Sequence, residues 1–148
     1  MRKRLPIGIQ TFAKIREEGC YYVDKPPQIL QLIDEGSHYF LSRPRRFGKS
    51  LLIDTIAELF EGNQALFEGL YAEPRWDWSQ QFAVIRISFG KGVLHSRAEL
   101  DEKIRELLAA ESRRHGLGYG RASISGEFSE LIRRLHEHSG HRVVVLVD

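Results

Sequence analysis

The sequence has few of the features that mark exported, membrane-bound or nucleic-acid-coating proteins. Cys20 is the single cysteine among 148 residues, so the chain can form no internal disulfide. No stretch approaches the roughly 20 apolar residues that a membrane-spanning helix needs. The basic start at residues 2–4 is followed by polar residues and not by the apolar core of a signal peptide. The net charge is only +2, which argues against a basic tail built for nucleic acid. We therefore expect a cytoplasmic protein without membrane attachment.

The segment Tyr39–Ser50 contains the most informative pattern in the chain. It ends in Gly48, Lys49 and Ser50, which match the last three positions of the phosphate-binding pattern G-x-x-x-x-G-K-[ST], or Walker A motif. In that motif, backbone N–H groups and the lysine bind nucleotide phosphates, and the hydroxyl binds Mg²⁺. Arg43 stands where the first glycine belongs. The sequence therefore predicts a variant phosphate-binding loop.

The residues around the loop predict the structural context that this motif requires. Residues 38–42 are apolar and aromatic enough for a short buried strand, and apolar residues recur at helical spacing from Lys49 until Gly62. A helix that begins at Lys49 would direct its free N–H groups toward an anion in the loop. The alternative is a solvated basic turn beside a helix start that matches the motif by chance.

The order Arg43-Pro44 predicts how the loop departs from the usual one. A proline favours an extended conformation for the residue before it, so we expect Arg43 not to take the positive φ that glycine supplies. Phosphate binding would then depend more on the cationic side chains of Arg45 and Arg46.

The rest of the chain alternates between predicted strands and helices. Strands are expected at 82–89 and 142–147, with a helix that starts at the pair Ser96 and Glu99 and a second helix near 128–139. Right-handed crossovers would make strands 38–42, 82–89 and 142–147 parallel. The length and composition suit one domain. We expect a single α/β domain over residues 1–148, a three-layer sandwich with a mostly parallel sheet.

Asp148 follows the apolar run Val143–Val147 directly. An apolar strand that ends in aspartate is typical of a Walker B segment, whose carboxylate helps to hold Mg²⁺ opposite the loop serine. The predicted metal ligands are therefore Ser50 and Asp148.

The motifs Tyr22–Lys25 and Phe40–Leu51 resemble the AAA-ATPase-like domain of bacterial P-loop proteins that commonly carry a PD-(D/E)XK nuclease-like domain toward their C-terminus. The resemblance resumes at Val143–Asp148. It implies a P-loop NTPase-like fold, ATP and Mg²⁺ as ligands, and nucleic acid as a partner of the nuclease-like domain. One departure is Pro26, where the family tends to have threonine.

The resemblance also implies that the family continues past Asp148 with a second acidic residue, further strands and the nuclease-like domain. We accordingly expect a fragment that binds ATP with little or no hydrolysis, because the acid that orients water would follow Asp148. The missing strand would leave exposed sheet edges that favour self-association.

The leading hypothesis is Mg-ATP binding by one continuous set of residues. This set is Arg43, Pro44, Arg45, Arg46, Phe47, Gly48, Lys49, Ser50 and Leu51. One alternative is a nucleic-acid-binding module that uses the loop arginines, and another is a fragment without function. The choice between ATP and GTP stays open. The role of Tyr22 and Asp24 also stays open, because these residues suit either nucleotide contact or packing and helix capping. Trp76 and Trp78 fit a core better than a base-stacking site.

Overall fold

The computed structural model describes residues 2–90, 92–120 and 123–148, and the chain divides into two compact units, Met1–Gln81 and Phe82–Asp148. Each unit has its own apolar core. The phosphate-loop motif lies in the first unit and the Walker B-like strand in the second.

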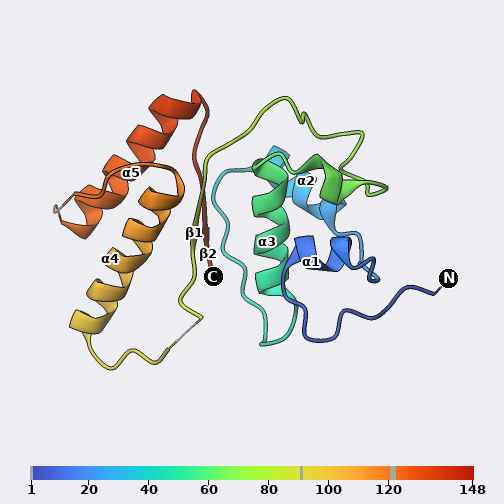
Figure 1. Ribbon diagram of the computed structural model, residues 1–148, viewed down its shortest axis with the longest axis horizontal. Helices are drawn as coiled ribbons and strands as arrows, with labels where there is room; N and C mark the ends of the chain where they lie inside the picture. Colours follow the sequence, from blue (N-terminus) through green and yellow to red (C-terminus); the bar gives the residue numbers. More distant parts are fainter. Residues whose placement is uncertain (1, 91, 121–122) are drawn as a thin grey trace. The chain divides into compact units, whose positions relative to one another are not determined.

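The first unit is helical in its described residues (Figure 1). It consists of α1 (Phe12–Glu17), α2 (Pro26–Glu35), α3 (Lys49–Phe60) and the 3₁₀ turn η1 (Gln64–Phe67). Two prolines open α2, where their missing N–H groups cost no helix hydrogen bond. The predicted helix from Lys49 is confirmed.

Aromatic residues make up much of the first core. Phe12 and Phe67 are fully buried with ring centroids 4.8 Å apart, and the Trp78 ring lies 5.2 Å from Phe67. Trp76 meets the Phe60 ring edge-on at 5.2 Å. Both tryptophans therefore belong to the core, as their spacing in the sequence indicated.

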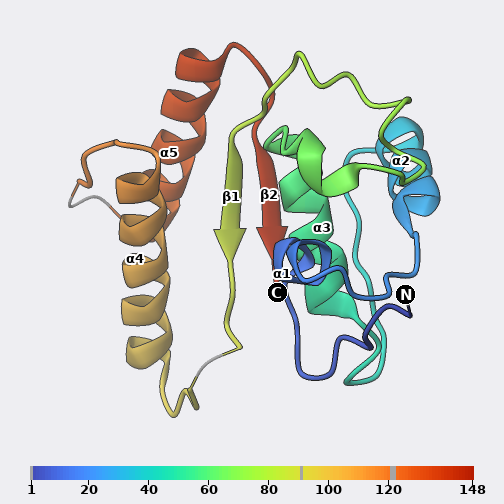
Figure 2. The ribbon, with the colours of Figure 1, turned by 45° about the vertical axis from the view of Figure 1, so that its right-hand side comes forward.

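The second unit contains a parallel pair of strands with two helices on one side (Figure 1). Its elements are β1 (Val84–Ile87), α4 (Arg97–Arg114), α5 (Ile124–Ser139) and β2 (Val144–Val147). Val84 pairs with Val144 and Ile87 with Val147, and both strands point the same way (Figure 2). The predicted parallel arrangement of these two strands is confirmed, although each strand is shorter than expected.

The helices of the second unit bury apolar stripes against β1. Leu108 of α4 and Leu131 and Leu135 of α5 pack with Ile85 in one core. The Ser96 hydroxyl accepts the Glu99 N–H at 3.2 Å and caps α4, as predicted. No helix in the described ranges has both the length and the hydropathy to cross a membrane.

Side chains of α4 close the outer edge of β1. The buried carboxylate of Glu111 accepts the backbone N–H of Arg86 at 3.1 Å. The carbonyl of Val84 receives the Arg114 guanidinium and lies 3.0 Å from His115 Nε2. These contacts occupy two of the backbone groups that an edge strand would otherwise offer to another chain, the Arg86 N–H and the Val84 carbonyl.

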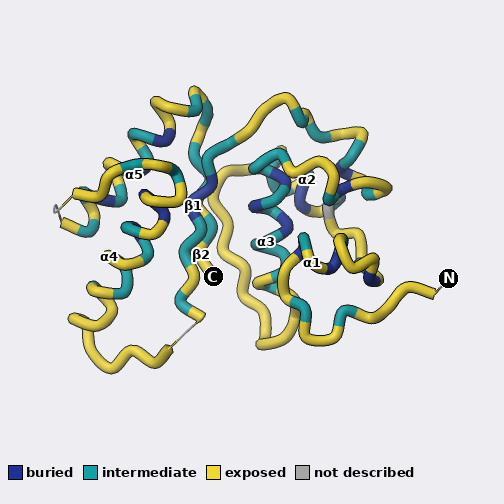
Figure 3. Tube along the Cα trace, viewed as in Figure 1, coloured by how far each residue is buried: buried dark blue, intermediate teal, exposed yellow. Residues whose placement is uncertain are grey.

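The predicted strand at 38–42 is wrong. The segment has no regular structure, and Tyr39, Phe40 and Leu41 are 57%, 93% and 50% exposed. Figure 3 shows the exposed run continuing into the loop. Strand preference expresses contacts with neighbouring strands, and the described part of the first unit has no strand to pair with it. The described residues thus establish an α/β chain with a two-stranded parallel sheet.

Candidate functional site

The loop before α3 bends through two residues in the left-handed region. Arg46 has φ 63°, and Gly48 has φ 76° and ψ 23°. Arg46 is the one non-glycine residue with positive φ among the described residues, so Arg43 does not take the glycine conformation, as its position before Pro44 predicted. The left-handed position within the arginine run is therefore Arg46, at a cost of about 1–2 kcal/mol for a residue with a Cβ.

The N-terminus of α3 opens directly onto this loop. Gly48 is the residue before the helix, and no side chain caps the helix there. The first intrahelical bond that reaches Gly48 comes from the N–H of Leu52, at 3.0 Å. The N–H groups of Lys49, Ser50 and Leu51 precede that bond and have no helical acceptor. Together with the helix dipole, they form a place that favours an anion.

The side chain of Lys49 folds back across the loop. Its Nζ donates a hydrogen bond to the carbonyl oxygen of Arg43 at 2.8 Å. The ammonium therefore spans from the start of α3 to the opposite end of the loop. An ammonium held at this turn is the group with which the motif lysine binds phosphate oxygens.

The arginines add positive charge that the described residues do not neutralise. The Arg43 guanidinium lies over the exposed ring of Phe47, 5.9 Å from its centroid. The exposed side chains of Arg45 and Arg46 make no hydrogen bond or ion pair with the described part of the chain. All residues from Arg43 to Gly48 are exposed, so the loop is open to a ligand from solvent (Figure 3).

The two predicted magnesium ligands lie in different units. Ser50 is exposed in the first turn of α3. Asp148 extends the parallel pairing, since its N–H donates to Ile87 and its carbonyl accepts from Phe89, both at 2.8 Å. Its carboxylate thus follows the carboxyl end of a parallel strand, where α/β proteins bind ligands. A Mg²⁺ site shared by the two residues stays a prediction from the sequence. Within the described ranges no three His, Cys, Asp or Glu residues form a metal cluster.

Tyr22 and Asp24 have structural contacts in the first unit. The ring of Tyr22 meets that of Phe12 edge-on at 5.0 Å, and Asp24 accepts the backbone N–H of Tyr71. Burial raises the pKa of the Tyr22 hydroxyl, and the nearby Asp24 carboxylate adds to the rise. These contacts favour a structural role for both residues. The predicted capping of α2 by Asp24 is wrong, because no side chain caps that helix and the carboxylate binds Tyr71 instead.

Lys25 lies beside the phosphate loop, although the loop motif does not include it. A Cβ built onto Gly48 would lie 3.8 Å from Lys25 Nζ, so the ammonium is next to the start of α3. The signal was present in the segment Tyr22–Lys25, but no local rule connects it to a loop more than twenty residues later.

Comparison with known proteins identifies the family. The chain matches the family described as "Predicted AAA-ATPase" over residues 6–148. The chain belongs to this AAA-ATPase-like family. It is 57% identical over 148 residues, 99% of its length, to "Uncharacterized protein in vnfD 5'region" of Azotobacter chroococcum mcd 1. It spans 29% of the length of that relative. No solved structure matches the chain.

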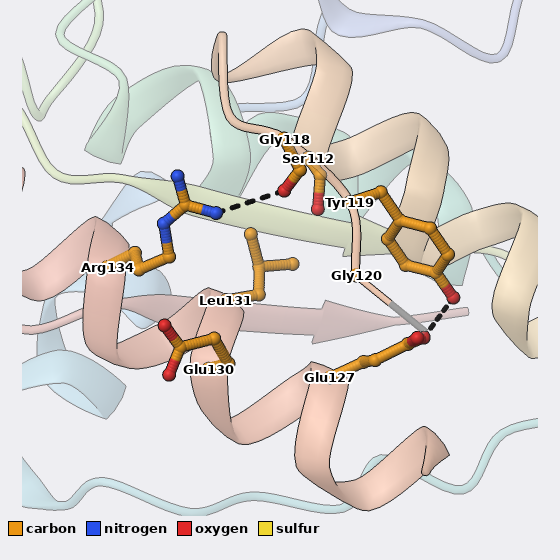
Figure 4. A pocket seen from close by; sticks show the side chains of 8 residues that line it. All are labelled: Ser112, Gly118, Tyr119, Gly120, Glu127, Glu130, Leu131 and Arg134. Carbon is orange, nitrogen blue, oxygen red and sulfur yellow. Dashed lines mark hydrogen bonds between the residues drawn. The ribbon is translucent and has the colours of Figure 1, made fainter. Parts of the chain in front are cut away.

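A separate hollow in the second unit of this AAA-ATPase-like chain involves none of the predicted site residues. Its volume is about 270 Å³, and Figure 4 shows side chains of α5 facing the segment after α4. The Tyr119 hydroxyl donates to Glu127, and the Arg134 guanidinium donates to the Gly118 carbonyl at 3.0 Å. Because these polar groups bind one another, the hollow offers weaker support for a ligand than the loop does.

Proposed function

We propose that this AAA-ATPase-like chain is an ATP-binding P-loop domain that holds Mg-ATP at residues 43–51. The observation that carries the proposal is the hydrogen bond from Lys49 Nζ to the Arg43 carbonyl, across a loop that turns at left-handed Gly48. In this arrangement the Lys49 ammonium, the free N–H groups at the start of α3 and the Gly48 turn lie at one place. Nucleotide phosphates bind to this combination.

Each residue of the loop has a role in the proposal. The backbone from Phe47 to Leu51 supplies N–H groups to the phosphates, Gly48 provides the turn, and Pro44 keeps the residue before it extended. When nucleotide binds, the Lys49 ammonium leaves the Arg43 carbonyl oxygen and donates to phosphate oxygens instead. Arg45 and Arg46 add charge-assisted contacts from exposed positions.

We also propose a P-loop NTPase-like sandwich as the fold, with Ser50 and Asp148 as candidate ligands of Mg²⁺. The parallel pair β1–β2 and the position of Asp148 after β2 support this proposal. Mg²⁺ would neutralise phosphate charge, and the Ser50 hydroxyl and Asp148 carboxylate are oxygen ligands of the kind it prefers. Self-association is a further proposal, because the apolar side chains of segment 38–42 are exposed.

Titration calorimetry of the purified chain with ATP tests the proposed function. We expect binding that requires Mg²⁺ and is lost in Lys49→Ala. A matched control is Lys14→Ala, which removes the same charge from α1, where the ammonium lies 3.9 Å from Glu18. Titration with GTP measures the base preference.

The same experiment separates nucleotide binding from nucleic-acid binding. If the loop arginines bind a nucleic-acid backbone, affinity for an oligonucleotide will fall steeply with salt and will not depend on Lys49 or Mg²⁺. Absence of Mg-ATP binding by the wild-type chain contradicts the proposal. Little or no hydrolysis by the 148-residue chain stays a prediction, which steady-state phosphate release measures.

A further inference from the structure

Lys25 places a second ammonium group beside the phosphate loop. Its Nζ lies 3.8 Å from where a Cβ at Gly48 would be, at the residue that precedes the N-terminus of α3. Gly48 is the glycine next to Lys49, so both lysines flank the same backbone turn. They reach it from different parts of the first unit.

The backbone of Lys25 is held on its N-terminal side by the two contacts of the preceding residues. Tyr22 packs against the buried ring of Phe12. The Asp24 carboxylate accepts the N–H of Tyr71 at 2.9 Å. A residue directly after Asp24 therefore has little freedom to move away from the loop.

On its C-terminal side, Lys25 is the residue that directly precedes α2. Its carbonyl accepts the N–H groups of Gln28 at 3.0 Å and of Ile29 at 3.3 Å. Ile29 is buried in the first core, so this helix start is anchored. The side chain thus leaves a fixed point of the backbone and extends to Gly48.

The ammonium of Lys25 has no hydrogen-bond or ion-pair partner among the described residues. It lies instead near the positive end of the α3 dipole, beside a loop that carries further cations. Like charges placed together repel, and an anion bound between them removes that repulsion. The arrangement therefore favours a ligand with several negative charges.

We propose that Lys25 is a phosphate-binding residue, and that Lys25 and Lys49 bind the phosphate chain of the nucleotide from two sides. The proposal rests on the proposed function, and it adds a residue outside the loop motif. The proposal also gives Tyr22 and Asp24 a role, because their contacts hold the backbone from which the Lys25 side chain extends to the loop.

Calorimetry of the 148-residue chain with Mg-ATP tests the proposal through two substitutions. Lys25→Met keeps the apolar stem and removes the charge, and Lys25→Arg keeps the charge. We expect Lys25→Met to weaken binding about tenfold or more, as for the loss of a charge-assisted contact, and Lys25→Arg to restore most of it. The loss should shrink at high salt, because salt screens the contact. The control Lys14→Ala should bind as the wild type does.

The outcomes separate this inference from the proposed function. If Lys25→Met binds Mg-ATP as tightly as wild type while Lys49→Ala does not bind, the inference is overturned and the proposed function stands. If Lys25→Met and Lys25→Arg both lose binding and melt at a lower temperature, Lys25 is structural and the inference is overturned. If the wild type does not bind Mg-ATP, the proposed function is wrong, and the inference about Lys25, which rests on it, is overturned as well.

Discussion

The Asp24 carboxylate accepts a hydrogen bond from the backbone N–H of Tyr71 at 2.9 Å. The contact joins the segment before α2 to the segment after η1, 47 residues later in the chain. It lies one residue before Lys25. A single exposed hydrogen bond therefore connects the stability of the first unit to the side chain that faces the phosphate loop.

We expect Asp24→Ala to destabilise the first unit by about 1 kcal/mol, the net value of one hydrogen bond. Asp24→Asn keeps a side-chain oxygen acceptor and should lose less. Both tryptophans lie in the first core, so tryptophan fluorescence in a urea titration reports on this unit. Asp34→Ala, at an exposed position of α2, is the control. Equal stability of wild type and Asp24→Ala would contradict the prediction.

Gly48→Ala tests the left-handed turn at the start of α3. The added Cβ would make an ordinary contact with Lys25 Nζ, so the cost comes from φ 76° and should be about 1–2 kcal/mol. We expect a similar loss of stability in Gly69→Ala, where φ is 75° and nothing lies within 4 Å. Mg-ATP affinity should fall in Gly48→Ala alone. An equal fall in both variants would show that the effect is general destabilisation.

We expect ionisation of the Tyr22 hydroxyl to lower the stability of the first unit at alkaline pH. Burial raises the pKa of this hydroxyl in the folded chain above the unfolded value of about 10. Below that pH the hydroxyl is protonated in both states and its contribution is fully present. As the pH rises toward the folded pKa, the unfolded state loses its proton first and stability falls.

Urea titrations followed by tryptophan fluorescence at pH 8 and pH ~10.5 measure this loss of stability. The first pH lies below the unfolded tyrosine pKa of about 10, and the second lies above it. We expect Tyr22→Phe to reduce this loss. The control is Tyr21→Phe, at an exposed neighbouring side chain, which should keep the wild-type pH dependence. Identical pH dependence in Tyr22→Phe would rule out this source.

Glu111 should stabilise the second unit by holding the outer edge of β1. Its carboxylate binds the Arg86 N–H at 3.1 Å and the Arg114 guanidinium at 2.9 Å, and it is almost fully buried. Glu111→Ala removes the acceptor from both groups and should cost about 1–3 kcal/mol. Amide hydrogen exchange at Arg86 and thermal unfolding by circular dichroism measure the effect. Glu106→Ala, which loses an exposed pair with Lys103, should change stability by under about 1 kcal/mol.

Local sequence patterns were sufficient for the glycine turn of the loop and for most of the helices. Gly48, Lys49 and Ser50 predicted a turn followed by a helix, because glycine conformation and helix periodicity are properties of neighbouring residues. Pro44 likewise predicted the conformation of Arg43. The motifs around these residues also predicted the family, which the match over residues 6–148 confirms.

Only the tertiary structure decided what depends on residues far apart in the chain. Segment 38–42 has the composition of a strand, yet it stays irregular because a strand forms through hydrogen bonds to a partner. Lys25 lies beside Gly48 through contacts between segments far apart in the chain, such as the Asp24 hydrogen bond to Tyr71. The sequence by itself determined the turn at Gly48 and the helix that follows it, and long-range packing determined which distant cation lies beside them.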